Sequence, residues 1–144
     1  MVYEKEMKLM AALRKLYKTL DDSLSKHLKE LGISTTDYLI LVVLDGTGPI
    51  PMQELGDHLL ITSGTITYAT NRIINKGLVI KVQDSEDKRK FFLKLTDVGY
   101  DTLRRVNKEH LPYISKVLGS FSGDQLDEMT ETIKKLGTTV KKDK

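Results

Sequence analysis

The sequence contains no cysteine among its 144 residues. This absence excludes disulfide frameworks, zinc sites built on thiolates, catalytic thiols and redox sensing through cysteine. A response of this protein to its surroundings must therefore use other chemistry.

Long apolar runs are also absent from the sequence. A membrane-spanning helix needs about 18 consecutive apolar residues, and no such stretch occurs. The first residues include Glu4, Lys5 and Glu6 instead of the apolar segment of a signal peptide. We therefore expect a cytoplasmic protein with no membrane partner. Its 40% hydrophobic and 30% charged residues are typical of a globular domain.

Net charge is small overall, but it is unevenly distributed. The whole chain carries a net charge of only +3. Residues 62–96 contain 7 basic and 3 acidic side chains, a local charge of +4, and the other residues together sum to −1. A basic excess confined to one short segment is typical of a surface that binds nucleic acid.

Hydrophobic periodicity predicts two helices at the start of the chain. Apolar residues recur at steps of three and four from Met7 to Leu31, and Gly32 ends this long amphipathic helix. A second helix begins at Ser34, which forms a capping-box-like pair with Asp37.

The middle of the chain predicts two short helices and a hairpin. The helices are expected over residues 52–60 and 62–76, joined by a very short turn. The period then changes, and residues 78–82 and 90–95 are predicted to form strands around a charged, protruding loop at residues 83–89.

Two further helices are expected after the hairpin. Thr96 caps the first of them, and Pro112 inside its apolar stripe is expected to kink it. Ser122 and Gln125 form a capping box that starts the last helix. The predicted fold class is therefore mainly α with a small β-hairpin wing, a winged helix-turn-helix with long N- and C-terminal helices.

The order of these elements predicts one domain, residues 1–144, with two functional regions. Residues 34–96 form the DNA-binding lobe, and residues 1–31 and 97–144 form a helical dimerisation region. The terminal apolar stripes are longer than one small winged-helix core can cover. Each stripe would be buried by a two-fold partner, so a homodimer is expected.

The second helix of a helix-turn-helix enters the major groove of double-stranded DNA. Its N-terminal turns must present small or polar groups and free amides, while its other face packs on the domain. Gly64 would let this helix approach the DNA backbone closely. The alternative interpretation is that the Ser and Thr residues at the start of this helix serve only to cap it. The candidate DNA-binding residues are Thr62, Ser63, Gly64, Thr65, Thr67, Tyr68, Asn71 and Arg72.

The hairpin tip supplies a second set of candidate DNA contacts. Arg89 could enter a minor groove, where negative potential is focused, and Asp87 could hold its guanidinium extended. Lys88 and Lys90 would then lie near phosphates. A solvated charged turn is the alternative, although the position directly after a helix pair favours the wing.

The stretch GLVIKVQDSEDKRKFFLKLTDVG, from Gly77 to Gly99, resembles the MarR family of winged-helix regulators. Asp87 and Arg89 match the D-x-R pair of the family's wing, and the run SGTITY from Ser63 to Tyr68 lies where the family has its recognition helix. The resemblance covers essentially the whole chain. It implies an intertwined dimer built from the terminal helices.

This resemblance also implies a ligand-responsive transcription factor. We expect a homodimeric repressor that binds a pseudo-palindromic operator and releases it on binding a small effector. The family pocket lies between the first two helices and the lobe, where Met10, His27 and Tyr38 are candidate lining residues. Such residues on an amphipathic helix also fit an ordinary core.

Two details refine the resemblance. The family often has arginine and proline where this chain has Val82 and Gln83, so phosphate contacts at the base of the wing are not carried over. The SG-x-ITY run is similar to an MhqR-like branch that responds to hydroquinones and related phenols. The lack of cysteine excludes the peroxide-sensing subset.

Other classes of function remain as alternatives. A winged-helix protein could act through protein–protein contacts of its helical arms instead of an operator. A small hydrolase would need Ser63 and His58, but no triad or metal spacing includes His27, His58 or His110. We therefore expect neither an enzyme nor a cofactor.

Overall fold

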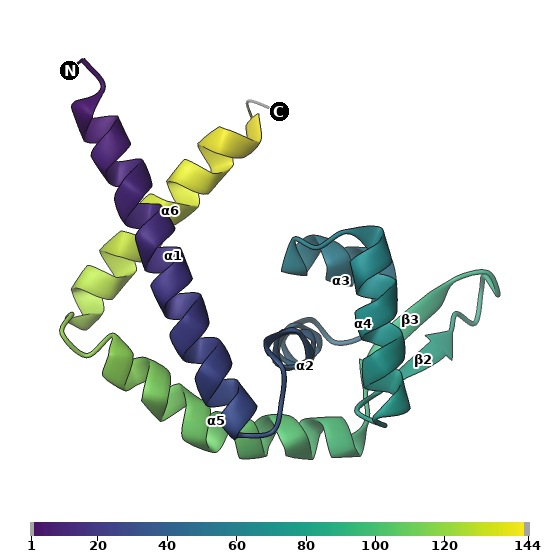
Figure 1. The fold of residues 1–144 in the computed structure, drawn as a ribbon. Helices are drawn as coiled ribbons and strands as arrows, with labels where there is room; N and C mark the ends of the chain where they lie inside the picture. The colour runs from purple at the N-terminus through teal and green to yellow at the C-terminus, as the bar shows by residue number, and fades with distance from the viewer. Residues whose placement is uncertain (1, 143–144) are drawn as a thin grey trace. The chain divides into compact units, whose positions relative to one another are not determined.

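The computed structural model describes residues 2–142, which form six helices and a small antiparallel sheet (Figure 1). In chain order the elements are α1 (Glu4–Glu30), α2 (Thr35–Thr47), β1 (Ile50–Pro51), α3 (Met52–Leu59), α4 (Ser63–Asn75), β2 (Val79–Gln83), β3 (Phe91–Leu95), α5 (Asp97–Val117) and α6 (Gly123–Lys142). The predicted fold class, a winged helix-turn-helix with long terminal helices, is confirmed.

The chain divides into two compact units at the boundary between His110 and Leu111. The first unit contains α1 to α4, the sheet and most of α5. The second contains the end of α5 and α6. This boundary lies inside α5, because Leu103 and Val106 of α5 are buried in the core of the first unit.

The hydrophobic core of the first unit joins all its helices to the sheet. Leu28 is the one buried residue of α1, so the rest of that helix does not contribute to the core. The largest fully buried apolar side chains are Leu28, Ile40, Leu41, Leu44, Leu55, Ile73, Val79, Leu93 and Val106. The helix-turn-helix is therefore packed from several sides and holds α4 in a defined orientation.

Helix starts follow the capping signals of the sequence. The Ser34 Oγ accepts the backbone N–H of Asp37 at 3.1 Å, as the N-cap of α2. Ser122 and Gln125 form a reciprocal capping box at the start of α6, with N···O distances of 2.9 and 3.2 Å. The capping box expected at Ser34 is only half formed, because the Asp37 carboxylate bonds Arg72 of α4 and Lys76, the C-cap residue of that helix.

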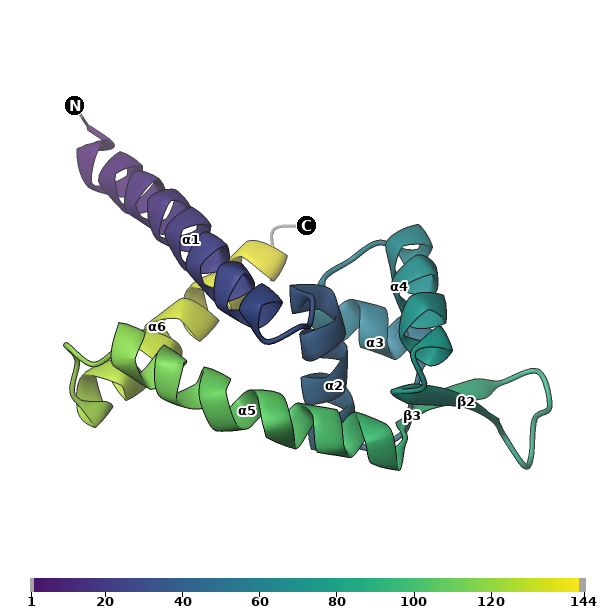
Figure 2. The same ribbon diagram turned by 60° about the horizontal axis from the view of Figure 1, so that its bottom comes forward.

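The sheet has three strands in the order β1-β3-β2, with both pairs antiparallel. The predicted hairpin is β2 and β3, in which Lys81 pairs with Leu93. Seen in Figure 2, the hairpin and its loop extend away from α3 and α4. The two-residue strand β1 was not predicted. Its Pro51 cannot donate a backbone hydrogen bond, which suits an edge position but masks the strand in the sequence.

Two glycines join the lobe to α5. Gly77 ends α4 with a φ of +74°, a left-handed conformation that favours glycine. At Gly99, a Cβ would lie 2.1 Å from the Leu78 carbonyl oxygen, so only glycine allows this close approach. The Thr96 hydroxyl donates to the Gly77 carbonyl at 2.6 Å and accepts the Gly99 N–H at 3.0 Å.

Among residues 2–142, no helix is long and apolar enough to cross a membrane. α5 continues as one helix through Pro112.

Candidate nucleic-acid interface

Helix α4 separates its side chains into a buried and an exposed face. Ile66, Ala69 and Ile73 pack into the core of the first unit. The opposite face is exposed and consists of Ser63, Gly64, Thr65, Thr67, Tyr68 and Asn71, all of them among the predicted DNA contacts. The core thus fixes which side of α4 is available to a partner.

The first turn of α4 has free backbone donors. The first hydrogen bond of the helix runs from the Ile66 N–H to the Thr62 carbonyl at 2.9 Å, and the Thr62 Oγ1 accepts the Thr65 N–H at 3.4 Å. The amides of Ser63 and Gly64 have no partner among the described residues. A Cβ at Gly64 would meet nothing within 4 Å, so the surface around this turn is open. Such a turn is suited to contact an anion such as a phosphate.

Arg72 lies differently from the other predicted residues of α4. Its Nη2 donates to the Asp37 Oδ1 at 2.8 Å and to the Ser34 Oγ at 3.1 Å. The hydrogen bond to Asp37 and the charge of that carboxylate raise the pKa of Arg72. The guanidinium is therefore bound to α2, although sequence reasoning placed it among the DNA contacts.

In the wing, Arg89 is paired with Asp87 and exposed to solvent. The Arg89 Nε and Nη2 donate to the two Asp87 carboxylate oxygens at 3.1 and 3.3 Å, while the Arg89 side chain is 90% exposed. The hydrogen bonds from the side chain and backbone of Arg89 lower the pKa of Asp87. Asp87 thus steadies an arginine that faces solvent.

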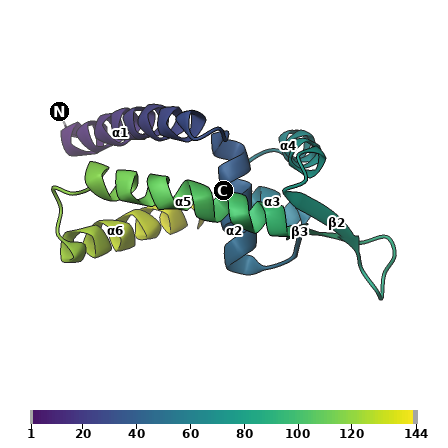
Figure 3. The same cartoon turned by 90° about the horizontal axis from the view of Figure 1, so that it is seen from below.

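The loop of the wing is closed by hydrogen bonds at its base. The backbone N–H of Asp84 donates to the Lys90 carbonyl at 2.9 Å, and the side-chain Nε2 of Gln83 donates to the Lys88 carbonyl at 2.6 Å. Lys88 and Lys90 are exposed. In the view of Figure 3 the hairpin projects past α4.

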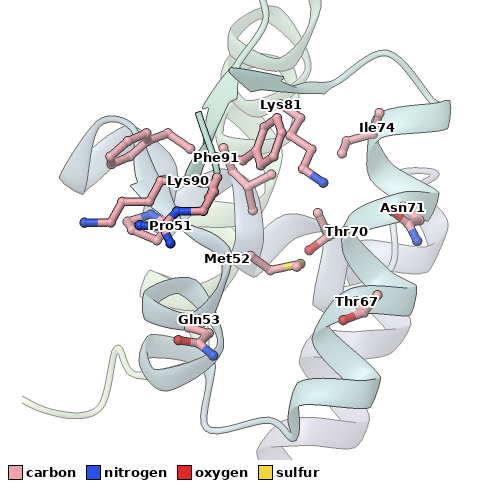
Figure 4. Close-up of a pocket in the computed structure, with 13 residues that line it drawn as sticks. Pro51, Met52, Gln53, Thr67, Thr70, Asn71, Ile74, Lys81, Lys90 and Phe91 are labelled. Carbon is pink, nitrogen blue, oxygen red and sulfur yellow. The ribbon is translucent and has the colours of Figure 1, made fainter. Parts of the chain in front are cut away.

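A cleft of about 650 Å³ lies between α4 and the wing. Figure 4 shows Thr67, Thr70 and Asn71 on its α4 side, and Lys81 and Phe91 on the sheet side. Arg89 and Lys90 also line it, and the Lys81 Nζ lies 4.5 Å from the centre of the Phe91 ring. The exposed face of α4 and the basic wing therefore border one concave surface.

Comparison with known proteins agrees with this arrangement. A model of the MarR family matches residues 31–90, which contain α2 to the end of the wing loop. The HTH-type transcriptional regulator MhqR of Bacillus subtilis (strain 168) is 30% identical over 138 residues, which cover 96% of this chain and 95% of MhqR. The chain belongs to the MarR family of transcriptional regulators.

Solved structures show the same MarR-type fold. A mutant MarR from E. coli complexed with operator DNA has a TM-score of 0.81 and 20% identity, over 94% of this chain and 98% of that one. The organohalide-sensing regulator RdhR in its 2,4-dichlorophenol-bound form has a TM-score of 0.80 and 21% identity, over 94% and 81% of the two chains. At these identities the likeness establishes the fold.

The residues suggested for the MarR-type pocket are only partly brought together. The Nδ1 atoms of His27 and His110 lie 2.8 Å apart, and the Tyr38 ring meets the His110 ring edge-on with centroids 5.1 Å apart. The Tyr38 hydroxyl donates to the Asn107 Oδ1 at 2.9 Å. Met10 lies 17 residues before His27, about 26 Å along the same helix, and is 61% exposed.

Burial shapes the acid–base properties of this ring cluster. Burial lowers the pKa of His110, and the charge of His27 lowers it further. Burial also raises the pKa of Tyr38. Among the described residues, no group of three or more His, Asp or Glu side chains is arranged to hold a metal ion.

Sequence reasoning missed the residues that anchor α4 and the ring cluster. Asp37 and Lys76 were not singled out, because the first was assigned to a cap and the second to a helix end. The spacing of Arg72 and Lys76, one helical turn apart on the same face, was the available signal. His110 and Asn107 had no signal of their own, because only the fold brings α5 beside α2.

Proposed function

We propose that this chain is a homodimeric repressor that binds a pseudo-palindromic operator in double-stranded DNA and is released by a small aromatic effector. The observation that carries the proposal is the cleft, which α4 and the wing border together. Its exposed polar helix face and its cations are complementary to a base edge and a phosphate backbone. The protein is expected to act in the cytoplasm, where its DNA partner lies.

In the proposed complex, α4 lies in the major groove. The free amides of Ser63 and Gly64 contact a phosphate, with Thr62 and Thr65 beside them. Thr67 and Asn71 face base edges, and an asparagine side chain suits adenine because it can both donate and accept. Tyr68, also exposed, contacts the backbone or a neighbouring base.

The wing makes the second contact of the complex. Arg89, held extended by Asp87, enters the minor groove. Lys88 and Lys90 neutralise phosphates on either side, and Lys81 does so from within the cleft. These contacts give affinity and register, whereas α4 gives sequence preference.

Dimerisation would place two such lobes on one operator. Exposed apolar residues on α1 and α6 support residues 1–31 and 97–144 as the dimerisation region, since apolar stripes of this length are rarely left in water. They are Met7, Met10, Leu16 and Tyr17 on α1, and Met129, Ile133, Leu136 and Val140 on α6. The two recognition helices would contact half-sites about 34 Å apart.

The effector is proposed to be a small phenol. RdhR, which shares the fold, has been solved with 2,4-dichlorophenol bound. In this chain, His27 and Tyr38 supply ring and hydrogen-bonding groups at the junction of α1, α2 and α5. Binding there would favour a spacing of the lobes that no longer fits the operator.

Selection of bound DNA from a random pool tests the proposal. A repressor of this kind selects a pseudo-palindrome, and its affinity for that DNA falls steeply with salt because phosphate contacts release counterions. Arg89→Ala should weaken binding and make the salt dependence shallower. A panel of phenols then shows whether an effector releases the selected DNA.

Failure to select any sequence, with no salt-dependent binding, would contradict the DNA-binding function. The exposed apolar residues of α1 and α6 would then support the alternative of a winged-helix protein that acts through protein contacts. If Arg89→Ala leaves the salt dependence unchanged, only the proposed role of the wing is refuted, and the DNA-binding function stands.

A further inference from the structure

Asp37 is a buried acid that belongs neither to the proposed DNA contacts nor to the hydrophobic core. Its side chain is 0% exposed, in the first turn of α2. The Arg72 Nη2 donates to its Oδ1 at 2.8 Å, and the Lys76 Nζ donates to its Oδ2 at 2.6 Å. Arg72 lies in the last turn of α4 and Lys76 is the C-cap residue that follows it, so one carboxylate of α2 holds the C-terminal end of the recognition helix.

This cluster keeps Asp37 ionised. Burial alone would raise the pKa of Asp37, but hydrogen bonds from Lys76 and Arg72, together with their charges, lower it below the ordinary value. A buried carboxylate is costly unless it is paired and hydrogen-bonded. The two cations are therefore required where they are, and their release would leave a buried charge unpaired.

Arg72 is held from several sides. Besides Asp37, its Nη2 bonds the Ser34 Oγ at 3.1 Å, the same atom that caps α2. Its Cζ lies 6.0 Å from the centre of the Tyr68 ring, and its Nε is buried. The guanidinium therefore lies against α2, whereas Thr67 and Asn71 of the same helix are exposed.

We propose that Asp37 is a specificity-determining positioning residue, which fixes α4 on α2 and withholds Arg72 from DNA phosphates. This inference rests on the proposed DNA-binding function. A cation on phosphate raises the affinity for every sequence alike, because phosphates carry no sequence information. By withholding Arg72, Asp37 keeps this uniform contribution out of the complex. By fixing α4 on α2, it also holds the uncharged side chains of that helix in place for base edges, which favours discrimination between operator and random DNA.

Asp37→Asn tests this role with a side chain of the same shape and no charge. Arg72 then becomes free to turn to a phosphate. One added phosphate contact steepens the salt dependence of log K by about 0.9, which corresponds to about five-fold tighter binding of random DNA at 0.15 M salt. We expect this gain on random DNA. On the operator the gain is offset, because α4 loses its anchor on α2 and its base contacts weaken, so the operator-to-random affinity ratio falls. A residue that only stabilises the fold would lower the melting temperature without steepening the salt dependence.

Arg72→Gln and Lys88→Gln form a matched pair that does not depend on the folding of the Asp37 variant. Both remove one cation from the DNA-binding lobe. Lys88→Gln should make the salt dependence shallower by about 0.9, whereas Arg72→Gln should leave it unchanged. The double variant Asp37→Asn/Arg72→Gln should return to the wild-type salt dependence.

Each outcome decides the inference. An Arg72→Gln variant that loses as much salt dependence as Lys88→Gln would overturn it, because Arg72 would then already contact phosphate. An Asp37→Asn variant that folds and keeps the wild-type salt dependence would overturn it as well. If the wild-type protein binds no DNA, the proposed function fails, and this inference fails with it.

Discussion

Gly64→Ala separates the stability of the protein from its binding to DNA. In the free protein a Cβ at this position meets nothing within 4 Å, and the backbone conformation suits alanine. Alanine reduces the conformational freedom of the unfolded chain, so the free energy of unfolding should rise by about 0.4–1 kcal/mol. Stability alone would therefore predict a neutral or beneficial substitution.

On DNA the same methyl group should be harmful. In the proposed complex the amides of Ser63 and Gly64 bond a phosphate, and a hydrogen bond to a charged group contributes about 1.5–3 kcal/mol. A methyl group that holds this turn away from the phosphate would remove that contact. The expected loss is about ten-fold to 150-fold in operator affinity.

Thermal unfolding and fluorescence anisotropy with a labelled operator measure the two effects. Gly46→Ala is the matched control, because a Cβ there also meets nothing within 4 Å and the residue lies in α2, outside the proposed DNA contacts. It should stabilise the protein and leave DNA binding unchanged. A Gly64→Ala protein that binds the operator as tightly as the wild type would refute the close approach of α4 to the backbone.

Three further predictions concern stability and assembly. Gly99→Ala places a Cβ 2.1 Å from the Leu78 carbonyl oxygen and should cost about 1–3 kcal/mol of unfolding free energy in a denaturant titration, and a value near zero would contradict the packing. The pKa of buried His110 is lowered, so the unfolded state binds a proton at a higher pH than the folded state does. The free energy of unfolding should therefore fall as the pH drops below about 6.5. His110→Phe should flatten this pH profile, and the control His58→Gln should not. Ile133→Lys places a charge in the apolar stripe of α6 and should weaken dimerisation about ten-fold or more, as measured by analytical ultracentrifugation. The control Thr138→Lys, on the opposite face of α6, should leave the dimer intact.

Local chemistry explains why much of the fold could be predicted. Ser34 and Ser122 cap the helices that they were expected to cap, and Thr62 caps α4. Gly77 follows α4 in a left-handed conformation that favours glycine. Capping and left-handed turns depend on a few neighbouring residues, so the sequence specifies them directly.

The features that sequence reasoning missed all depend on distant contacts. Asp37 suits an N-terminal turn, and only the packing of α4 on α2 turns its carboxylate toward Arg72. β1 is recognisable only through its pairing with β3. His27 and His110 are 83 residues apart in sequence, and neither marks the other.

The candidate DNA contacts on α4 could be predicted because buried and exposed residues alternate along a helix with a regular period. The apolar positions of α4 point to its buried face, so the exposed polar face follows from the same period of 3.6 residues. Arg72 shows the limit of this reasoning, since it lies at the edge of that face and its direction depends on a charge in another helix.

The most direct test of the central claim compares operator and random DNA for two variants, Asn71→Ala and Lys88→Ala. The account predicts that Asn71→Ala loses about 1–3 kcal/mol on the operator and nothing on random DNA, because it removes a base contact. Lys88→Ala should weaken both equally and make the salt dependence shallower by about 0.9, because it removes a phosphate contact. An equal loss on both DNAs for Asn71→Ala would contradict sequence readout by α4.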